Sequence, residues 1–196
     1  MKKRLYLVRH GLKEAASGDP ALTNEGIEQA RITGKYLKKY PIKKILSSPS
    51  LRTRQTAEKI AAYLNLPFTV HNDLRERANW GDDPEQSFDD FLEMWQKSTE
   101  ERNWEPPIGS SSKAAGERLF SVIDQETQSD QEVMFVTHGG IIADFLQNQF
   151  DDSKLNKKIK ECSVTIVEFD SEKQHYEIIE LAQVEHLKNL LINDKE

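Results

Sequence analysis

With 196 residues, 37% of them hydrophobic and 31% charged, the sequence is long enough to bury the core of one domain, which we expect to span residues 1–196. The net charge of −6 argues against nucleic acid as the main partner, and no apolar run approaches the roughly 20 residues of a membrane span. The single cysteine, Cys162, excludes an internal disulfide, and the apolar stretch after the basic start is too short for a signal peptide, so we expect a cytoplasmic protein.

Short apolar runs alternate with segments of helical periodicity in the first half of the chain. Strands are expected over Arg4–Val8, Lys44–Leu46 and Pro67–Val70. Helices are expected between them, one capped by Thr23 and closed by Pro41, and one starting at Ser50. A polar loop from Asn72 to Pro84 follows the third strand.

The second half continues the alternation. Helices are expected around Phe88–Trp95, from Ser112 to Ile123, around Ile142–Leu146, and as a charged tail from Gln183 packed through Val184, Leu187 and Leu191. Strands are expected over Val133–Val136, Val164–Phe169 and Tyr176–Leu181, the last two as a hairpin. Strands that alternate with helices predict an α/β fold, a three-layer α/β/α sandwich with a mostly parallel central sheet.

Three polar segments follow expected strands at the point where each strand ends. They are Arg9-His10-Gly11, Ser47-Ser48-Pro49 and Thr137-His138-Gly139-Gly140. Because the carboxyl ends of parallel strands meet at one edge of an α/β sheet, we expect these segments to converge. A single histidine at a strand end is more often structural than functional, but two of them beside an arginine favour a functional site.

Arg52 lies in the first turn of the helix that follows Ser48-Pro49. Free backbone N–H groups attract an anion there, and a guanidinium matches phosphate oxygens, although a solvated helix face explains the spacing equally well. The five histidines show no His-x-His spacing and the one cysteine allows no Cys-x-x-Cys pair, so we expect neither a metal site nor a cofactor.

Five motifs occur in a specific order along residues 4 to 150. They are Arg9-His10-Gly11, Leu22-Thr23-x-x-Gly26-x-x-Gln29-Ala30, Ser47-Ser48-Pro49-x-x-Arg52-x-x-Gln55-Thr56-Ala57, Leu74-Arg75-Glu76 and Thr137-His138-Gly139-Gly140. With this ordered set the chain resembles the histidine phosphatase superfamily, which includes cofactor-dependent phosphoglycerate mutases and many phosphatases.

The resemblance implies a role for each matched residue. His10 would attack phosphorus and become a phosphohistidine, and Glu76 would protonate the leaving oxygen and then take a proton from water. The phosphoryl oxygens would be held by Arg9, Gly11, Arg52 and His138. Elementary chemistry is consistent with these roles, because a neutral imidazole is a nucleophile and cationic side chains can cancel phosphoryl charge without a metal.

The loop that follows Glu76 contains two candidates for contact with the non-phosphate part of the substrate. Arg77 and Trp80 would bind its non-phosphate part, or else they are a salt-bridging arginine and a lid-packing tryptophan. By contrast, Cys162, His71, His175 and His186 are interpreted as structural or surface residues.

The chain departs from the family pattern where relatives line the substrate. Lys13 and Ala16 replace a common threonine and asparagine, and Gly109-Ser110-Ser111 lacks the glutamate of a common Gly-Glu-Ser. These motifs therefore do not identify the substrate.

Only a modest stretch, Asn79 to Ser112, is available to cover the site, whereas a mutase must exclude water. We favour a phosphatase acting on a small-molecule phosphomonoester or a phosphorylated protein. The alternatives are a phosphoglycerate mutase and a phosphate-binding scaffold protein.

Overall fold

A computed structural model describes residues 1–150, 158–188 and 190 of the chain. Their strands form one six-stranded sheet in the order β3-β2-β4-β1-β5-β6. The strands are β1 (Lys2–Arg9), β2 (Ile42–Ser47), β3 (Phe68–Val70), β4 (Glu132–Thr137), β5 (Val164–Asp170) and β6 (His175–Gln183). The pairs among β3, β2, β4 and β1 are parallel, and β5 and β6 add an antiparallel edge.

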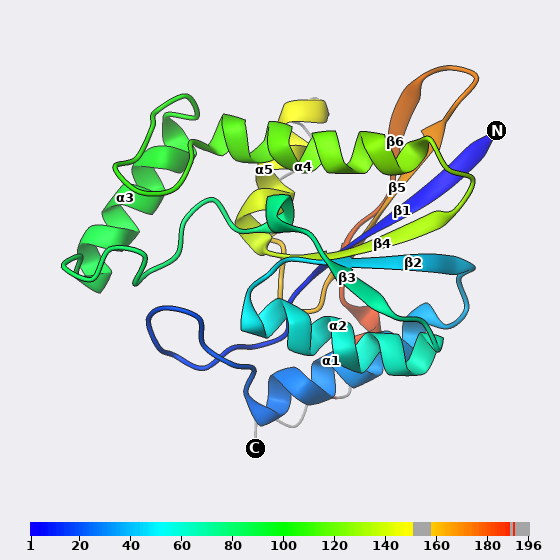
Figure 1. The fold of residues 1–196 in the computed structure, drawn as a ribbon, viewed down its shortest axis with the longest axis horizontal. Coiled ribbons are helices and arrows are strands. Elements are labelled where there is room, and N and C mark those ends of the chain that lie inside the picture. Colours follow the sequence, from blue (N-terminus) through cyan, green and yellow to red (C-terminus); the bar gives the residue numbers. More distant parts are fainter. Residues whose placement is uncertain (151–157, 189, 191–196) are drawn as a thin grey trace.

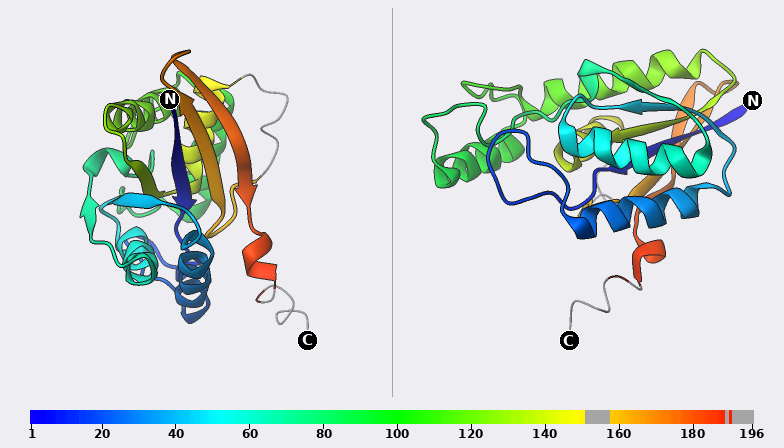
Figure 2. Two further views of the ribbon diagram at one scale, coloured as in Figure 1. Left: turned by 90° about the vertical axis from the view of Figure 1, so that its right-hand side faces the viewer. Right: turned by 60° about the horizontal axis from the view of Figure 1, so that its bottom comes forward.

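Helices cover both faces of this sheet, so the expected three-layer sandwich is confirmed. As Figure 1 shows, α1 (Asn24–Leu37) and α2 (Leu51–Leu64) lie on one side, and α4 (Ser112–Thr127) and α5 (Gly139–Gln149) lie on the other. A fifth helix, α3 (Phe88–Glu100), lies beyond the end of the sheet and covers neither face (Figures 1 and 2).

The core divides into two layers because strand side chains point alternately to opposite faces. On β1, Leu5 and Leu7 are fully buried with the α4 and α5 side chains, whereas Tyr6 and Val8 pack with the α1 and α2 side chains. The apolar run at the start of the sequence therefore forms a central strand buried on both faces.

The tail differs from the helix expected from Gln183. Strand β6 continues to Gln183, which pairs with Val164 of β5, so backbone pairing with the sheet replaces the first helical turn. A short 3-10 turn, η3 (Glu185–Leu187), follows, and Leu187 is buried there as expected. Lys188 and Leu190, which come next among the described residues, are helical. Leu191 lies outside the described residues.

The parallel strands point their carboxyl ends toward the side of the molecule that carries α3 and the loop between β1 and α1 (Figure 1). A 3-10 turn, η1 (Asn72–Leu74), begins the expected polar loop on the same side. Among the helices of the described residues, none combines the length and apolar character that crossing a membrane requires.

Candidate active site

The polar segments after β1, β2 and β4 converge as expected. Their positions follow from sheet register, since the His10 N–H donates to Thr137 O at 2.9 Å and the Ser48 N–H donates to Val136 O at 2.9 Å. This brings the rings of His10 and His138 within 5.3 Å of each other between their centroids, at an angle of 68°. Two histidines that are 128 positions apart thus share one site.

The His10 imidazole is held in a single tautomer. Its Nδ1 lies 2.7 Å from the carbonyl oxygen of Gly11, which can only accept, so Nδ1 carries the proton and Nε2 keeps a free lone pair. Burial, and then the positive charges of Arg9 and Arg52, lower the pKa of His10 well below its usual value of 6.5. A buried neutral imidazole with one free nitrogen is suited to nucleophilic attack.

Gly11 makes this arrangement possible because the first turn of α1 lies against its Cα. A Cβ atom there would lie 2.5 Å from the carbonyl oxygen of Gly26, so no larger residue fits without moving the backbone. The Gly11 N–H also donates to Thr56 Oγ1 at 3.1 Å, which ties the loop to α2.

The second histidine is held by two fixed contacts. Arg52 Nη2 donates to His138 Nδ1 at 3.1 Å, so Nε2 carries the proton and donates to Ser48 Oγ at 2.7 Å. Burial, together with the nearby His10 and Arg52, lowers the pKa of His138 well below 6.5. The imidazole is therefore a neutral hydrogen-bond donor beside His10.

Two arginines from different elements approach the histidines. Arg52 is buried, its Nη2 donates to Asn79 Oδ1 at 2.6 Å, and its Nη1 lies 3.5 Å from Asp19 Oδ1. Arg9 donates from Nη1 to Ile159 O at 2.7 Å, and its Nη2 forms an ion pair with Glu161. Within the described part of the chain, the buried Nε–H groups of both arginines have no hydrogen-bond partner, as expected where an anion would bind.

The carboxylate of Glu76 is held at the N-terminus of α5. Its Oε1 accepts from Ile141 N at 2.8 Å, and its Oε2 accepts from Gly140 N at 2.9 Å. Gly140 permits this approach, since a Cβ atom there would lie 2.7 Å from Glu76 Oε1 and 2.6 Å from the Trp95 ring. Helix α5 therefore fixes the carboxylate across from the two histidines.

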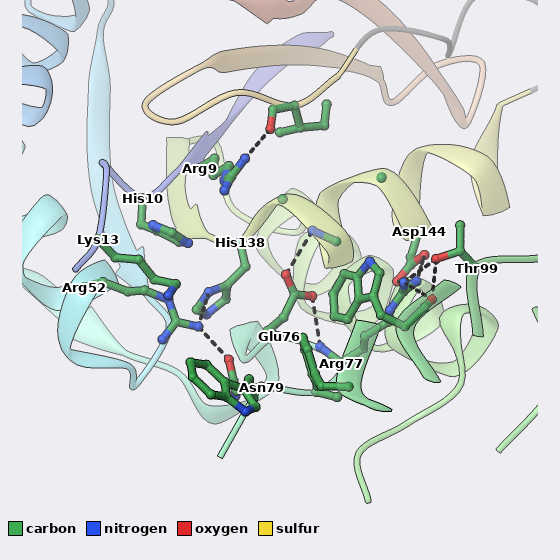
Figure 3. Close-up of a pocket in the computed structure, with 18 of the residues that line it drawn as sticks. Arg9, His10, Lys13, Arg52, Glu76, Arg77, Asn79, Thr99, His138 and Asp144 are labelled. Carbon is green, nitrogen blue, oxygen red and sulfur yellow. Dashed lines mark hydrogen bonds and ion pairs between the residues drawn. The ribbon is translucent and has the colours of Figure 1, made fainter. Parts of the chain in front are cut away.

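All five expected catalytic side chains line one cavity of about 610 Å³. In Figure 3, His10, Lys13, Arg52 and His138 gather on one side of the cavity, Arg77 and Asp144 lie on the other, and Glu76 lies between them. Burial, followed by the charges of Arg52 and Arg9, lowers the pKa of Lys13, because its ammonium group shares the cationic end.

Comparison with known proteins identifies the family. The model of branch 1 of the histidine phosphatase superfamily matches residues 5–181. The chain belongs to this superfamily. "Probable phosphoglycerate mutase GpmB" of Yersinia pestis is 29% identical over 183 residues, which cover 85% of each chain. "Uncharacterized phosphatase PhoE" of Bacillus subtilis is 41% identical over 83 residues, but the match covers only 39% of this chain and 42% of that protein.

Solved structures show the same fold. A mycobacterial glucosyl-3-phosphoglycerate phosphatase in complex with inorganic phosphate superimposes with a TM-score of 0.77, at 23% identity, over 94% of this chain and 99% of that chain. The relatives of this histidine phosphatase superfamily member thus include phosphatases and phosphoglycerate mutase-like proteins.

Arg77 lines the cavity, but its guanidinium is bound within the protein. It forms a buried ion pair with Asp144 at 3.0 Å, donates to Trp95 O at 3.2 Å, and lies 3.7 Å above the centre of the Trp95 ring. Further donor contacts reach Ser112 and Thr99. This geometry is that of the salt-bridging arginine, and direct contact between Arg77 and substrate stays a prediction.

Trp80 also lines the cavity, where it packs against Phe88 with 4.9 Å between the ring centroids. Its carbonyl oxygen accepts from Gly18 N at 2.8 Å and joins the two loops that border the cavity. Lys13 and Ala16, which depart from the family pattern close to His10, also line the cavity.

The third departure from the family pattern, the run Gly109-Ser110-Ser111, lies outside the cavity lining. Gly109 has φ of 102° and Ser111 caps α4 by accepting from Ala114 N, so this run builds a helix start and is not part of the cavity lining. Cys162, His71, His175 and His186 also lie outside the lining. In the part of the chain that the structure describes, no group of three or more His, Cys, Asp or Glu side chains is placed to hold a metal.

Sequence reasoning missed three polar residues of the site. Asp144 is a single acid in an apolar helix segment, which is a usable signal for a buried ion pair. Asn79 and Asp19, the partners of Arg52, stand in polar loops where nothing in the pattern distinguishes them from solvated residues.

Proposed function

We propose that this protein is a metal-independent phosphatase that hydrolyses phosphomonoesters through a phosphohistidine on His10, with Glu76 as the general acid and base. The observation that carries the proposal is the fixed tautomer of His10, which leaves Nε2 free at the cationic end of the cavity. Its pKa, lowered by burial and by Arg9 and Arg52, keeps this nitrogen unprotonated at neutral pH.

The reaction proceeds in two displacements. In the first, the Nε2 lone pair of His10 attacks phosphorus, the ester P–O bond breaks, and Glu76, which enters this step as the protonated carboxylic acid, gives its proton to the leaving oxygen. In the second, water attacks phosphorus, Glu76 takes a proton from it, and the P–N bond breaks to return the neutral imidazole. The proton on His10 Nδ1 stays there throughout, hydrogen-bonded to Gly11 O.

The phosphoryl oxygens are held by residues already at the site. Arg9 and Arg52 supply permanent positive charge and buried Nε–H groups without partners among the described residues. His138 supplies the Nε2–H that Ser48 Oγ now accepts. These charges and donors offset the negative charge of the transferring group, which is the role a metal plays in other phosphoryl-transfer sites.

Replacement of His10 tests the nucleophile. His10→Ala should lower kcat for a phosphomonoester by more than about a thousandfold. Wild-type enzyme mixed briefly with substrate and quenched in base should carry an acid-labile phosphoryl group that ³¹P NMR assigns to histidine. His71→Ala, outside the cavity, is the matched control, and full activity in His10→Ala would refute the assignment.

A chelator tests metal independence. Activity should persist after dialysis against EDTA, and loss of activity with rescue by zinc or magnesium would refute this part of the proposal.

A phosphoglycerate mutase is the second candidate, because relatives that match 85% of the chain are named probable mutases. Hydrolysis is favoured because the cavity admits water, as the half-exposed Phe88 and Leu92 of its lining indicate. One assay on 3-phosphoglycerate that follows both isomerisation and phosphate release separates the two. Phosphate binding without either product would favour the scaffold alternative.

The physiological setting also belongs to the proposal. The net charge of −6 and the single cysteine support a cytoplasmic enzyme that acts on a small phosphomonoester or a phosphorylated protein. Nucleic acid and membranes are not expected partners.

A further inference from the structure

Helix α3 turns its apolar side toward the active-site cavity instead of the core. Phe88, Phe91, Leu92 and Trp95 follow the spacing of one helical face, and all four line the cavity. Only Ser98 of this helix is buried, whereas Phe88 is 48% exposed and Leu92 is 46% exposed. An amphipathic helix normally hides such a face, so this one is available to a ligand.

The Nη donors on this side of the cavity are bound within the protein. Arg77 pairs with Asp144 at 3.0 Å, and its Nη atoms also donate to Trp95 O and two hydroxyl groups. Its buried Nε–H has no partner among the described residues. The other cationic side chains lie at the opposite end, where Lys13 and Arg52 surround His10 (Figure 3).

The cavity therefore has a cationic end and an apolar end. At about 610 Å³, it falls within the range of small-molecule sites and is far larger than one phosphoryl group requires. Trp80 and Phe88 extend the apolar end as a tilted aromatic pair with 4.9 Å between centroids. A ligand bound by its phosphate to the cationic end would place its other part against these rings.

We infer that the alcohol portion of the substrate is a bulky apolar or aromatic group that binds against the α3 face, and not a short polar chain such as glycerate. The inference rests on the proposed phosphatase activity. It assigns specificity to Phe88, Leu92 and Trp80, because hydrophobic burial of the leaving group would lower the free energy of the bound state and of the transition state together.

A series of primary alkyl phosphates tests this directly. Ethyl, butyl and hexyl phosphate share nearly the same leaving-group basicity, so differences in kcat/KM report contact with the cavity. We expect kcat/KM to rise about twofold to fourfold per methylene group, as partial to full burial of a methylene predicts. Butyl phosphate should exceed glycerol 3-phosphate by about tenfold or more, and 2-phenylethyl phosphate should be among the best substrates.

Two variants locate the effect on α3. Leu92→Asn and Phe88→Ser should each lower the hexyl-to-ethyl ratio of kcat/KM severalfold, because both side chains are half-exposed and line the apolar end. Ile179→Asn is the matched control, since Ile179 is a 40% exposed apolar residue of β6 outside the cavity. That variant should keep the wild-type ratio.

The outcomes separate this inference from the proposed function. If the enzyme hydrolyses ethyl and glycerol phosphates in a His10-dependent manner but kcat/KM is flat along the alkyl series, the phosphatase proposal stands and the inference is refuted. If no phosphomonoester is hydrolysed, the proposed function itself fails. A third outcome is that kcat/KM is flat along the alkyl series and the protein is a dimer that Phe88→Ser converts to a monomer. A second copy of the chain would then cover α3, which also refutes the inference.

Discussion

The buried ion pair between Arg77 and Asp144 gives the sharpest test of how the apolar side of the cavity is held. Both side chains are 3% exposed, and the pair joins the loop after Glu76 to α5. In Asp144→Asn, the Arg77 guanidinium stays buried without its carboxylate. Breaking such a pair costs about 3–5 kcal/mol. We expect the lower end because burial raises the pKa of Asp144 to about 7, so that part of its charge is already lost at neutral pH. Arg77 also keeps its contacts with Trp95 O and with Thr99.

Urea denaturation measures this effect. A loss of about 3 kcal/mol with an unchanged m-value should lower the midpoint by about 1–2 M. The double variant Arg77→Met with Asp144→Leu should recover much of the loss, because it removes both buried charges. The reasoning is refuted if Asp144→Asn costs less than about 1 kcal/mol, or if the double variant loses the sum of the two single losses.

Three further predictions concern the catalytic end. Burial lowers the pKa values of His10 and His138 well below 6.5 in the native chain. Below pH 6.5 the unfolded chain therefore binds more protons than the native chain. As the pH falls through this range, the free energy of unfolding should decrease by about 1.4 kcal/mol per pH unit for each of these histidines. His10→Gln should lower the slope by the share of one histidine, about 1.4 kcal/mol per pH unit, because the other histidines with lowered pKa values keep theirs. An unchanged slope would contradict this. Gly140→Ala should lower kcat at least tenfold with little change in phosphate inhibition, because its Cβ atom would displace Glu76. Lys13→Thr should weaken inhibition by inorganic phosphate several-fold, and equal inhibition in both proteins would place Lys13 outside the anion site.

Much of the fold follows from local patterns that need no knowledge of the tertiary structure. The apolar run of β1 is a buried strand because its residues favour extended backbone and both of its faces are covered. The placement of His10 and His138 at the ends of β1 and β4 then brings them together, since adjacent parallel strands end at the same edge. The sequence alone therefore predicts the cationic end of the site.

The tertiary structure alone shows which groups hold Arg77. Its partner, Asp144, is 67 positions away and its aromatic neighbour, Trp95, is on a third element, so no local pattern distinguishes a salt-bridging arginine from a substrate ligand. The same holds for the end of the chain, where pairing with Val164 keeps Gln183 in a strand despite the helical pattern that follows.

Helix α3 shows most clearly which features the sequence predicts and which depend on the tertiary structure. The spacing of Phe88, Phe91, Leu92 and Trp95 establishes an amphipathic helix, because side chains three and four positions apart share a face. What that face meets depends on where the helix lies relative to the sheet, which periodicity does not encode. Only the packed chain places it over the cavity, and so the sequence predicts the residues of the cationic end while the tertiary structure alone shapes the apolar end.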